Sequence, residues 1–123
     1  MNKTPLNILV VDDEAELSEV IEYTLVRAGH FVKVMVSPQE ALRALGGDKI
    51  DVVLSDYHMP LMSGVDFYRG ARAIWDGHFF LLTGETYVDV DALKKIGIKD
   101  VLFKPKDLTR LIDVMAQLQR APD

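Results

Sequence analysis

The chain has 123 residues, of which 49% are hydrophobic and 27% charged, as is ordinary for one soluble globular domain. Its formal net charge of −5 argues against nucleic acid or an anionic membrane as the main partner, because both attract basic surfaces. The sequence contains no cysteine, which excludes disulfides, thiolate chemistry and cysteine-ligated zinc or iron–sulfur centres.

Five short segments rich in β-branched and aromatic residues predict strands. They are 7–11, 31–36, 51–55, 79–82 and 100–103. Three of these segments are nearly all apolar, as expected for strands that are covered on both faces of a sheet. The segment 31–36 alternates more between apolar and polar residues, which is typical of a strand at a sheet edge.

Apolar residues at helical spacing lie between the predicted strands and after the last one. The predicted faces of four helices are Leu17, Val20, Ile21, Thr24, Leu25 and Ala28; Phe67, Gly70, Ala71 and Ile74; Val90, Leu93 and Ile96; and Leu108, Leu111, Ile112, Met115 and Leu118. A further helix starts at Ser37 and Pro38 and ends at the pair Gly46–Gly47. Gly29 and Gly97 stand where a glycine commonly ends a helix.

Five strand–helix units in succession predict an α/β fold, with a parallel sheet and helices on both of its faces. Neither a repeat nor a low-complexity linker interrupts the series, so we expect one domain over 1–123 with its core at about 6–120. The last residues, 120–123, have the composition of a tail. A signal-peptide-like stretch is absent, as is any run of about 18 apolar residues, and we expect a cytoplasmic protein.

Polar side chains follow four of the five predicted strands at the point where each strand ends. Asp12 and Asp13 follow the first strand, Asp56 the third, Thr83 the fourth and Lys104 the fifth. Open parallel sheets place their sites beyond the carboxyl ends of the strands, so these groups should converge at one edge. Each group alone has an ordinary explanation: an acidic pair at a helix start, an aspartate in a turn, a threonine in a loop and a lysine on the surface. Only their occurrence together at the strand ends predicts a site.

The residue types at this edge suit phosphoryl transfer. Crowded carboxylates repel one another without a cation, and Mg²⁺ prefers a few carboxylate oxygens together with water. Lys104 adds a positive charge suited to a phosphate or a carboxylate, and Thr83 adds a hydroxyl group. With no cysteine and no Ser–His arrangement in view, the predicted nucleophile is a carboxylate that forms an acyl phosphate.

The chain resembles the receiver domain of bacterial two-component response regulators over essentially its whole length. Four segments carry the resemblance: ILVVDDE (8–14), DVVLSDYHMPLMSG (51–64), FFLLTGE (79–85) and GIKDVLFKP (97–105). The order of these motifs and the intervals between them also fit the family. The resemblance implies a flavodoxin-like (βα)5 sandwich with five parallel strands in the order 2-1-3-4-5.

The resemblance also implies the metal and phosphate chemistry of the site. Asp56 would accept the phosphoryl group from a phosphohistidine on a sensor histidine kinase or a phosphotransfer protein. Asp13, Asp56 and the backbone carbonyl of His58 would bind Mg²⁺ directly, and Asp12 would bind it through water. The output would pass to a downstream protein or a fused domain. We therefore expect a protein that catalyses only its own phosphorylation and dephosphorylation, without acting as a turnover enzyme.

Further residues receive roles from the same resemblance. Lys104 would pair with a phosphoryl oxygen, and Thr83 would move to hydrogen-bond the phosphate. A cis peptide bond is expected between Lys104 and Pro105, since this turn would aim the lysine back at the sheet edge. His58 and Glu85 lie two residues beyond Asp56 and Thr83, so both should overhang the site and modulate the lifetime of the phosphate.

The sequence departs from the family pattern in three places. Gly84 replaces the usual alanine or other small residue after the threonine, and the connection before the fourth strand is short by a few residues. Val101 stands where the family usually has tyrosine or phenylalanine, and valine cannot swing a ring between two positions. The expected switch region therefore comprises Thr83, Gly84, Tyr87 and Val101, with the signal carried mainly by the backbone of 83–90.

Two alternatives stay open. A degenerate receiver would bind a protein partner without phosphate, although all the chemical residues are present here. A phosphatase of the haloacid dehalogenase type would use an aspartate nucleophile within an Asp-x-Asp motif. Residues 56–58 are Asp-Tyr-His, and the 123 residues contain no substrate-capping domain, so this alternative is disfavoured.

Overall fold

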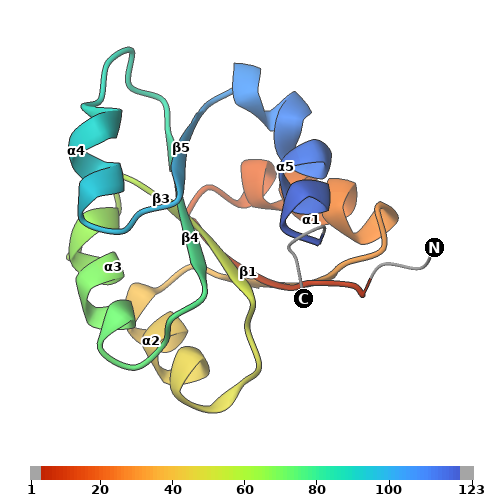
Figure 1. Ribbon diagram of the computed structural model, residues 1–123, viewed down its shortest axis with the longest axis horizontal. Coiled ribbons are helices and arrows are strands. Elements are labelled where there is room, and N and C mark those ends of the chain that lie inside the picture. The colour runs from red at the N-terminus through yellow and green to blue at the C-terminus, as the bar shows by residue number, and fades with distance from the viewer. Residues whose placement is uncertain (1–3, 120–123) are drawn as a thin grey trace.

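A five-stranded parallel sheet forms the centre of the computed structural model, which describes residues 4–119 (Figure 1). The strands are β1 (Asn7–Val11), β2 (Phe31–Met35), β3 (Val52–Asp56), β4 (His78–Thr83) and β5 (Asp100–Phe103). They lie in the order β2-β1-β3-β4-β5, which confirms both the predicted topology and the edge position of β2. The predicted tail at 120–123 lies outside the described residues.

Helices cover both faces of the sheet and make a three-layer sandwich (Figure 1). The helices are α1 (Ala15–Arg27), α2 (Pro38–Gly47), α3 (Gly64–Arg72), α4 (Val90–Lys95) and α5 (Leu111–Gln119), the last preceded by a 3₁₀ turn, η1 (Lys106–Arg110). On one face, Ile8 and Val10 of β1 pack with α1 and α5, while Leu9 and Val11 face α2 and α3 on the other. This alternation explains why the central strands are apolar throughout. Within residues 4–119, no helix is long and apolar enough to cross a membrane.

Each predicted helical face includes residues that turn toward the sheet and others, to either side of them around the helix, that are exposed. The predicted face residues that prove to be exposed are Val20, Ala28, Gly70, Ile74, Ile96 and Ile112. In α1 the small Ser18 is buried instead, and in α3 Tyr68 is buried instead. A helix buries the line that faces the sheet, so an apolar residue one step off that line reaches solvent while a small polar residue on it does not.

The helix ends follow the predicted signals. The Ser37 hydroxyl caps α2 by accepting a hydrogen bond from the Glu40 N–H at 3.3 Å, and α2 ends at Gly47. Gly29 and Gly97 have φ values of 99° and 115°, which lie in the left-handed region that favours glycine. The fifth helix differs from expectation, because its first residues form the 3₁₀ turn η1 and regular α-helix begins only at Leu111.

Tyr68 of α3 fixes the C-terminal end of α4. Its hydroxyl donates a hydrogen bond to the Ile96 carbonyl at 2.9 Å and accepts one from Arg72 Nε at 3.2 Å. The next residue, Gly97, lies so close that a Cβ atom built on it would collide with the Tyr68 hydroxyl. None of the described residues of α4 is fully buried, although Val90 and Leu93 pack partly against the core. The Tyr68 contact therefore anchors the C-terminal end of the helix.

Replacing Gly97 with alanine should therefore destabilise the protein by roughly 1–3 kcal/mol, because both the positive φ and the Tyr68 contact oppose a side chain. Gly46→Ala in α2 is the matched control. A Cβ there would meet no atom within 4 Å apart from its chain neighbours and the nearby backbone of α2, and alanine should stabilise the helix by up to about 1 kcal/mol. Urea unfolding measures both changes, and equal stability of Gly97→Ala and wild type would contradict the anchor.

Candidate functional site

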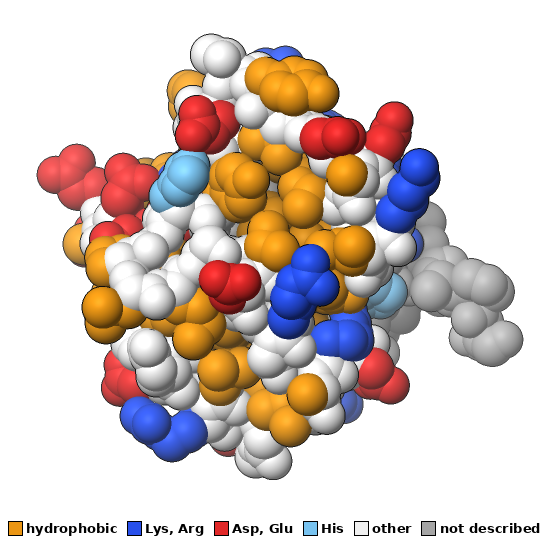
Figure 2. Space-filling view, turned by 90° about the vertical axis from the view of Figure 1, so that its left-hand side faces the viewer, with side chains coloured by type: hydrophobic (Ala, Val, Ile, Leu, Met, Phe, Trp, Pro, Cys, Tyr) orange, Lys and Arg blue, Asp and Glu red, His pale blue; other side chains and the backbone are white. Residues whose placement is uncertain are grey.

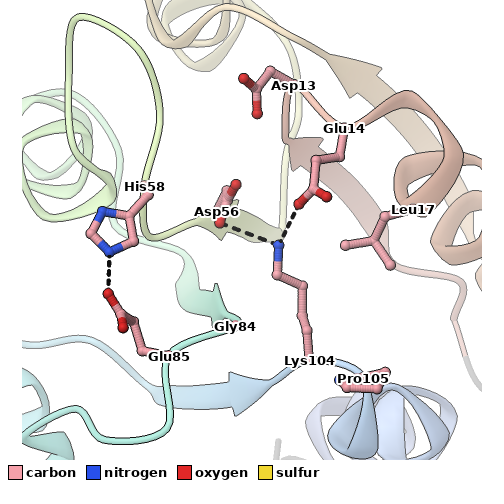
Figure 3. A pocket seen from close by; sticks show the side chains of 9 residues that line it. All are labelled: Asp13, Glu14, Leu17, Asp56, His58, Gly84, Glu85, Lys104 and Pro105. Carbon is pink, nitrogen blue, oxygen red and sulfur yellow. Dashed lines mark hydrogen bonds and ion pairs between the residues drawn. The ribbon is translucent and has the colours of Figure 1, made fainter.

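The carboxyl ends of the central strands open into a cavity of about 540 Å³ (Figure 3). The backbone joins these ends directly, because Tyr57 N–H donates to the Leu82 carbonyl at 2.8 Å and Lys104 N–H donates to the Thr83 carbonyl at 2.7 Å. The residues that line the cavity are Asp13, Glu14, Leu17, Asp56, His58, Gly84, Glu85, Lys104 and Pro105. The predicted residues that follow β1, β3 and β5 thus meet at this cavity as Asp13, Asp56 and Lys104, whereas Asp12 and Thr83 do not line it.

Three aspartates form a compact acidic cluster in this region. Asp12, Asp13 and Asp56 can each offer a carboxylate oxygen such that these atoms lie within 4.8 Å of one another. Asp13 is exposed, whereas Asp12 is 0% and Asp56 only 6% exposed. Oxygen ligands of this kind and spacing fit a hard cation such as Mg²⁺.

Asp12 is the most constrained carboxylate of the cluster. Its Oδ1 accepts a hydrogen bond from the Glu14 N–H at 2.8 Å, but its buried Oδ2 has no hydrogen-bond partner among residues 4–119. Burial is the largest influence on its pKa, and together with the nearby Asp56 it raises the pKa from the usual 3.8 to about 6, against the lowering effect of the Glu14 N–H. A bound cation would give the Oδ2 of Asp12 a partner and would reduce the repulsion between Asp12 and Asp56.

Lys104 points its ammonium group into the carboxylates (Figure 3). Its Nζ lies 2.9 Å from Glu14 Oε1, 3.4 Å from Asp56 Oδ1 and 3.7 Å from Asp12 Oδ2, and its side chain is 12% exposed. Burial alone would lower the pKa of Lys104, but the hydrogen bond to Glu14 and the charges of Asp12 and Asp56 outweigh it and raise the pKa. Lys104 is therefore charged at neutral pH. The bond to Pro105 is cis, as predicted.

Gly64, the glycine that closes the motif around Asp56, lets α3 approach the end of β3. A Cβ atom at Gly64 would collide with the Asp56 carbonyl and lie 2.7 Å from the Leu81 side chain. Ser63 caps this helix start by accepting the Asp66 N–H at 3.1 Å. The loop between Asp56 and α3 can thus fold back beside the cavity only because position 64 has no side chain.

His58 and Glu85 bridge the mouth of the cavity, as the sequence predicted that they would overhang it (Figure 3). His58 Nε2 lies 2.7 Å from Glu85 Oε1, and the two side chains are 69% and 49% exposed. The pair joins the loop after β3 to the loop after β4. Both side chains line the cavity that also holds Asp56.

The residues of the expected switch region are spread from the core to the surface. Thr83 is 1% exposed, and its hydroxyl oxygen accepts the Glu85 N–H at 3.0 Å. Val101 is 4% exposed and lies beside Leu81 in the sheet, in the core on the α2 and α3 face. Gly84 lines the cavity, while Tyr87 is 78% exposed.

Glu14 lines the cavity and contacts Lys104, and the sequence interpretation did not assign it to the site. It is the closest carboxylate to Lys104, although the two residues are 90 positions apart. A signal was present in the sequence, because Glu14 continues the acidic run after β1 and occupies the N-cap position of α1. A residue at that point faces the same sheet edge as the aspartates.

Comparison with known proteins identifies relatives over nearly the whole chain. The family described as response regulator receiver domain matches residues 8–116. The DNA-binding response regulator MtrA of Mycobacterium tuberculosis (strain H37Rv) is 37% identical over 120 residues, which cover 94% of this chain and 52% of MtrA. The transcriptional regulatory protein GlrR of Escherichia coli is 30% identical over 126 residues, which cover 99% of this chain and 28% of GlrR. The chain thus spans about half the length of MtrA, and less of GlrR.

Solved structures show the same fold. The chemotaxis protein CheY4 of Vibrio cholerae superimposes with a TM-score of 0.82 at 27% identity, covering 93% of this chain and 98% of CheY4. The receiver domain of the sensor histidine kinase PA1611 of Pseudomonas aeruginosa, solved with a magnesium ion in its active-site cleft, gives a TM-score of 0.81 at 24% identity. That match covers 96% of this chain and 100% of the PA1611 domain.

Replacing Asp12 with asparagine should stabilise the metal-free protein at pH 8 by roughly 1–3 kcal/mol. Asparagine keeps an oxygen for the Glu14 N–H but removes the buried charge. The pKa of Asp12 is about 6 in the folded protein and 3.8 in the unfolded chain. Its ionisation therefore takes no free energy from folding below pH 3.8. The loss of folding free energy grows between pH 3.8 and pH 6 and is complete above pH 6. The gain should therefore be smaller at pH 5.

Urea unfolding in EDTA at pH 5 and pH 8 measures the effect. The exposed Asp76, which lies between α3 and β4, provides the control Asp76→Asn, for which we expect no comparable gain. A gain for Asp12→Asn that is as large at pH 5 as at pH 8 would mean that the buried charge is not its cause.

Proposed function

The chain belongs to the receiver-domain family of response regulators, and from this premise we propose that it is a phosphorylatable switch. Asp56 accepts a phosphoryl group from a phosphohistidine on a sensor histidine kinase or a phosphotransfer protein, in a Mg²⁺-dependent reaction. The observation that carries the proposal is the position of Asp56 at the base of the cavity, 3.4 Å from Lys104 and within one acidic cluster with Asp12 and Asp13.

The same cluster would hold the metal ion. Asp13 and Asp56 would bind Mg²⁺ directly together with the backbone carbonyl of His58, and Asp12 would bind it through water. The buried Oδ2 of Asp12, which has no hydrogen-bond partner among residues 4–119, and the magnesium ion in the PA1611 receiver domain both support this assignment. When bound, Mg²⁺ would neutralise the negative charge that gathers on the transferred phosphoryl oxygens.

The protein's own residues supply the remaining chemistry. A carboxylate oxygen of Asp56 forms the new bond to phosphorus, while the P–N bond of the donor breaks and its electron pair returns to the imidazole ring. Lys104 is charged and already beside Asp56, so it can pair with a phosphoryl oxygen without a large movement. Thr83 then gives up the hydrogen bond that its hydroxyl oxygen accepts from the Glu85 N–H. Its hydroxyl group instead donates a hydrogen bond to the phosphate.

The output would leave through the segment after β4. Val101 is a buried aliphatic residue, so it has no ring to turn inward when Thr83 moves. The segment 84–89 lies between Thr83 and α4, and α4 is anchored at its far end by Tyr68. Figure 2 shows the side formed by α3 and α4, where many hydrophobic side chains reach the surface. Movement of this segment would change that surface for a downstream protein or a fused output domain.

The two alternatives are weaker on this geometry. A degenerate receiver, which acts without phosphate, would not need a charged lysine among three carboxylates. Such a group of charges is unfavourable in a site that holds no cation or phosphate. An aspartate-nucleophile phosphatase would need an acid two residues after Asp56, where this chain has His58 paired with Glu85.

The phosphoacceptor can be tested with acetyl phosphate and Mg²⁺, followed by intact-mass measurement. Wild type and the control Asp76→Asn should gain one acid-stable, base-labile phosphate, and Asp56→Asn should gain none, because the amide cannot attack phosphorus. An Asp56→Asn protein that still gained a labile phosphate would assign the acceptor to another residue. Failure of wild type to react would favour the degenerate receiver.

Replacing both His58 and Glu85 with alanine should change the rate of autodephosphorylation several-fold, because the pair lines the cavity of Asp56 and can order or block an attacking water there. The matched control is the double variant Lys33→Ala/Asp48→Ala, which removes an exposed ion pair of 2.8 Å outside the cavity. Loss of phosphate with time is measured on the purified phosphoprotein. Equal rates in wild type and His58→Ala/Glu85→Ala would show that the bridge does not control access.

A further inference from the structure

We infer that Glu14 is a positioning residue that holds Lys104 in the resting state and releases it when Asp56 carries a phosphoryl group. The inference rests on the proposed function and names a regulator of the same site. Its basis is the ranking of distances around Lys104 Nζ: 2.9 Å to Glu14, 3.4 Å to Asp56 and 3.7 Å to Asp12. The resting lysine is thus closest to a carboxylate that does not take part in the chemistry (Figure 3).

Glu14 differs from the other two partners in its freedom to move away. Its side chain is 61% exposed, whereas the side chains of Asp12 and Asp56 are 0% and 9% exposed. Leaving Lys104 would return Glu14 to water, at little cost for an exposed pair. The same step by Asp12 or Asp56 would leave a charge buried and unpaired. Of the three partners, Glu14 is therefore the one that can give Lys104 up.

Phosphorylation supplies the reason for the exchange. A phosphoryl group on Asp56 places up to two negative charges and several strong acceptor oxygens beside Lys104. These compete better for the ammonium group than one solvent-exposed carboxylate does. Before phosphorylation, Glu14 competes with Asp56 for Lys104. It also adds a negative charge to the cavity that the anionic donor must enter. Glu14 should thus make the active state harder to reach.

The first test is the affinity for beryllofluoride, a phosphoryl analogue, in the presence of Mg²⁺, followed by NMR. Glu14→Gln should bind beryllofluoride about two- to fivefold more tightly than wild type, the range expected for losing one exposed competing charge. Glu16→Gln is the control, since Glu16 lies exposed in the first turn of α1 and has no contact with Lys104 among the described ion pairs. It should bind like wild type.

A double-mutant cycle distinguishes competition for Lys104 from a general charge effect. In a Lys104→Met background, Glu14→Gln should no longer improve beryllofluoride affinity, because no lysine is left to release. An improvement that persists there, an equal improvement in Glu16→Gln, or weaker binding by Glu14→Gln would each overturn the inference.

A third measurement needs no phosphoryl analogue and no metal. The side-chain ¹⁵N signal of Lys104 should shift between wild type and Glu14→Gln and stay constant in Glu16→Gln, because only the first variant removes the negative charge 2.9 Å from Lys104 Nζ. An unchanged signal in Glu14→Gln overturns the inference even if beryllofluoride binds normally. If wild type binds no beryllofluoride at all, the proposed function fails, and the release step fails with it.

Discussion

One ammonium group among several carboxylates, at the point where parallel strands end, is the interaction on which the rest of this site depends. Lys104 partly offsets the repulsion between Asp12, Asp56 and Glu14, and it lies within 4 Å of all three. The offset is incomplete, because the pKa of Asp12 still rises to about 6 and its Oδ2 makes no hydrogen bond within residues 4–119. The folded protein thus keeps an unfavourable charge arrangement that a cation and a phosphate would complete.

The fold holds the buried part of this arrangement because the packed core fixes the strand ends that carry Asp12 and Asp56. The central strands are packed on both faces, so the strand ends cannot spread apart. Gly64 brings the α3 start against the Asp56 carbonyl, and the Lys104 N–H is tied to Thr83. The free energy gained by burying the apolar layers therefore offsets the cost of keeping Asp12 and Asp56 close together at the edge of the sheet.

The order of the layers and most of the site could be predicted from the sequence for one physical reason. A parallel sheet fixes where each strand ends, so residues that follow the strands must meet, and Asp12, Asp13, Asp56 and Lys104 do. What the sequence did not predict depends on side-chain reach and helix rotation. Val20 and Ile74 lie just off the buried lines of their helices, and the contact between Glu14 and Lys104 depends on two flexible side chains.

The two ends of α4 differ in a way that gives the proposed signal a direction. Its C-terminal end is fixed by the Tyr68 hydrogen bond and by the left-handed Gly97. Its N-terminal side continues into the segment that carries Glu85 and the exposed Tyr87. A shift of Thr83 toward a phosphate would remove the hydrogen bond to the Glu85 N–H, and Glu85 is also the partner of His58 across the cavity. In the proposed switch, loosening of the bridge and movement of the α4 start would therefore be coupled, while Tyr68 holds the other end of α4.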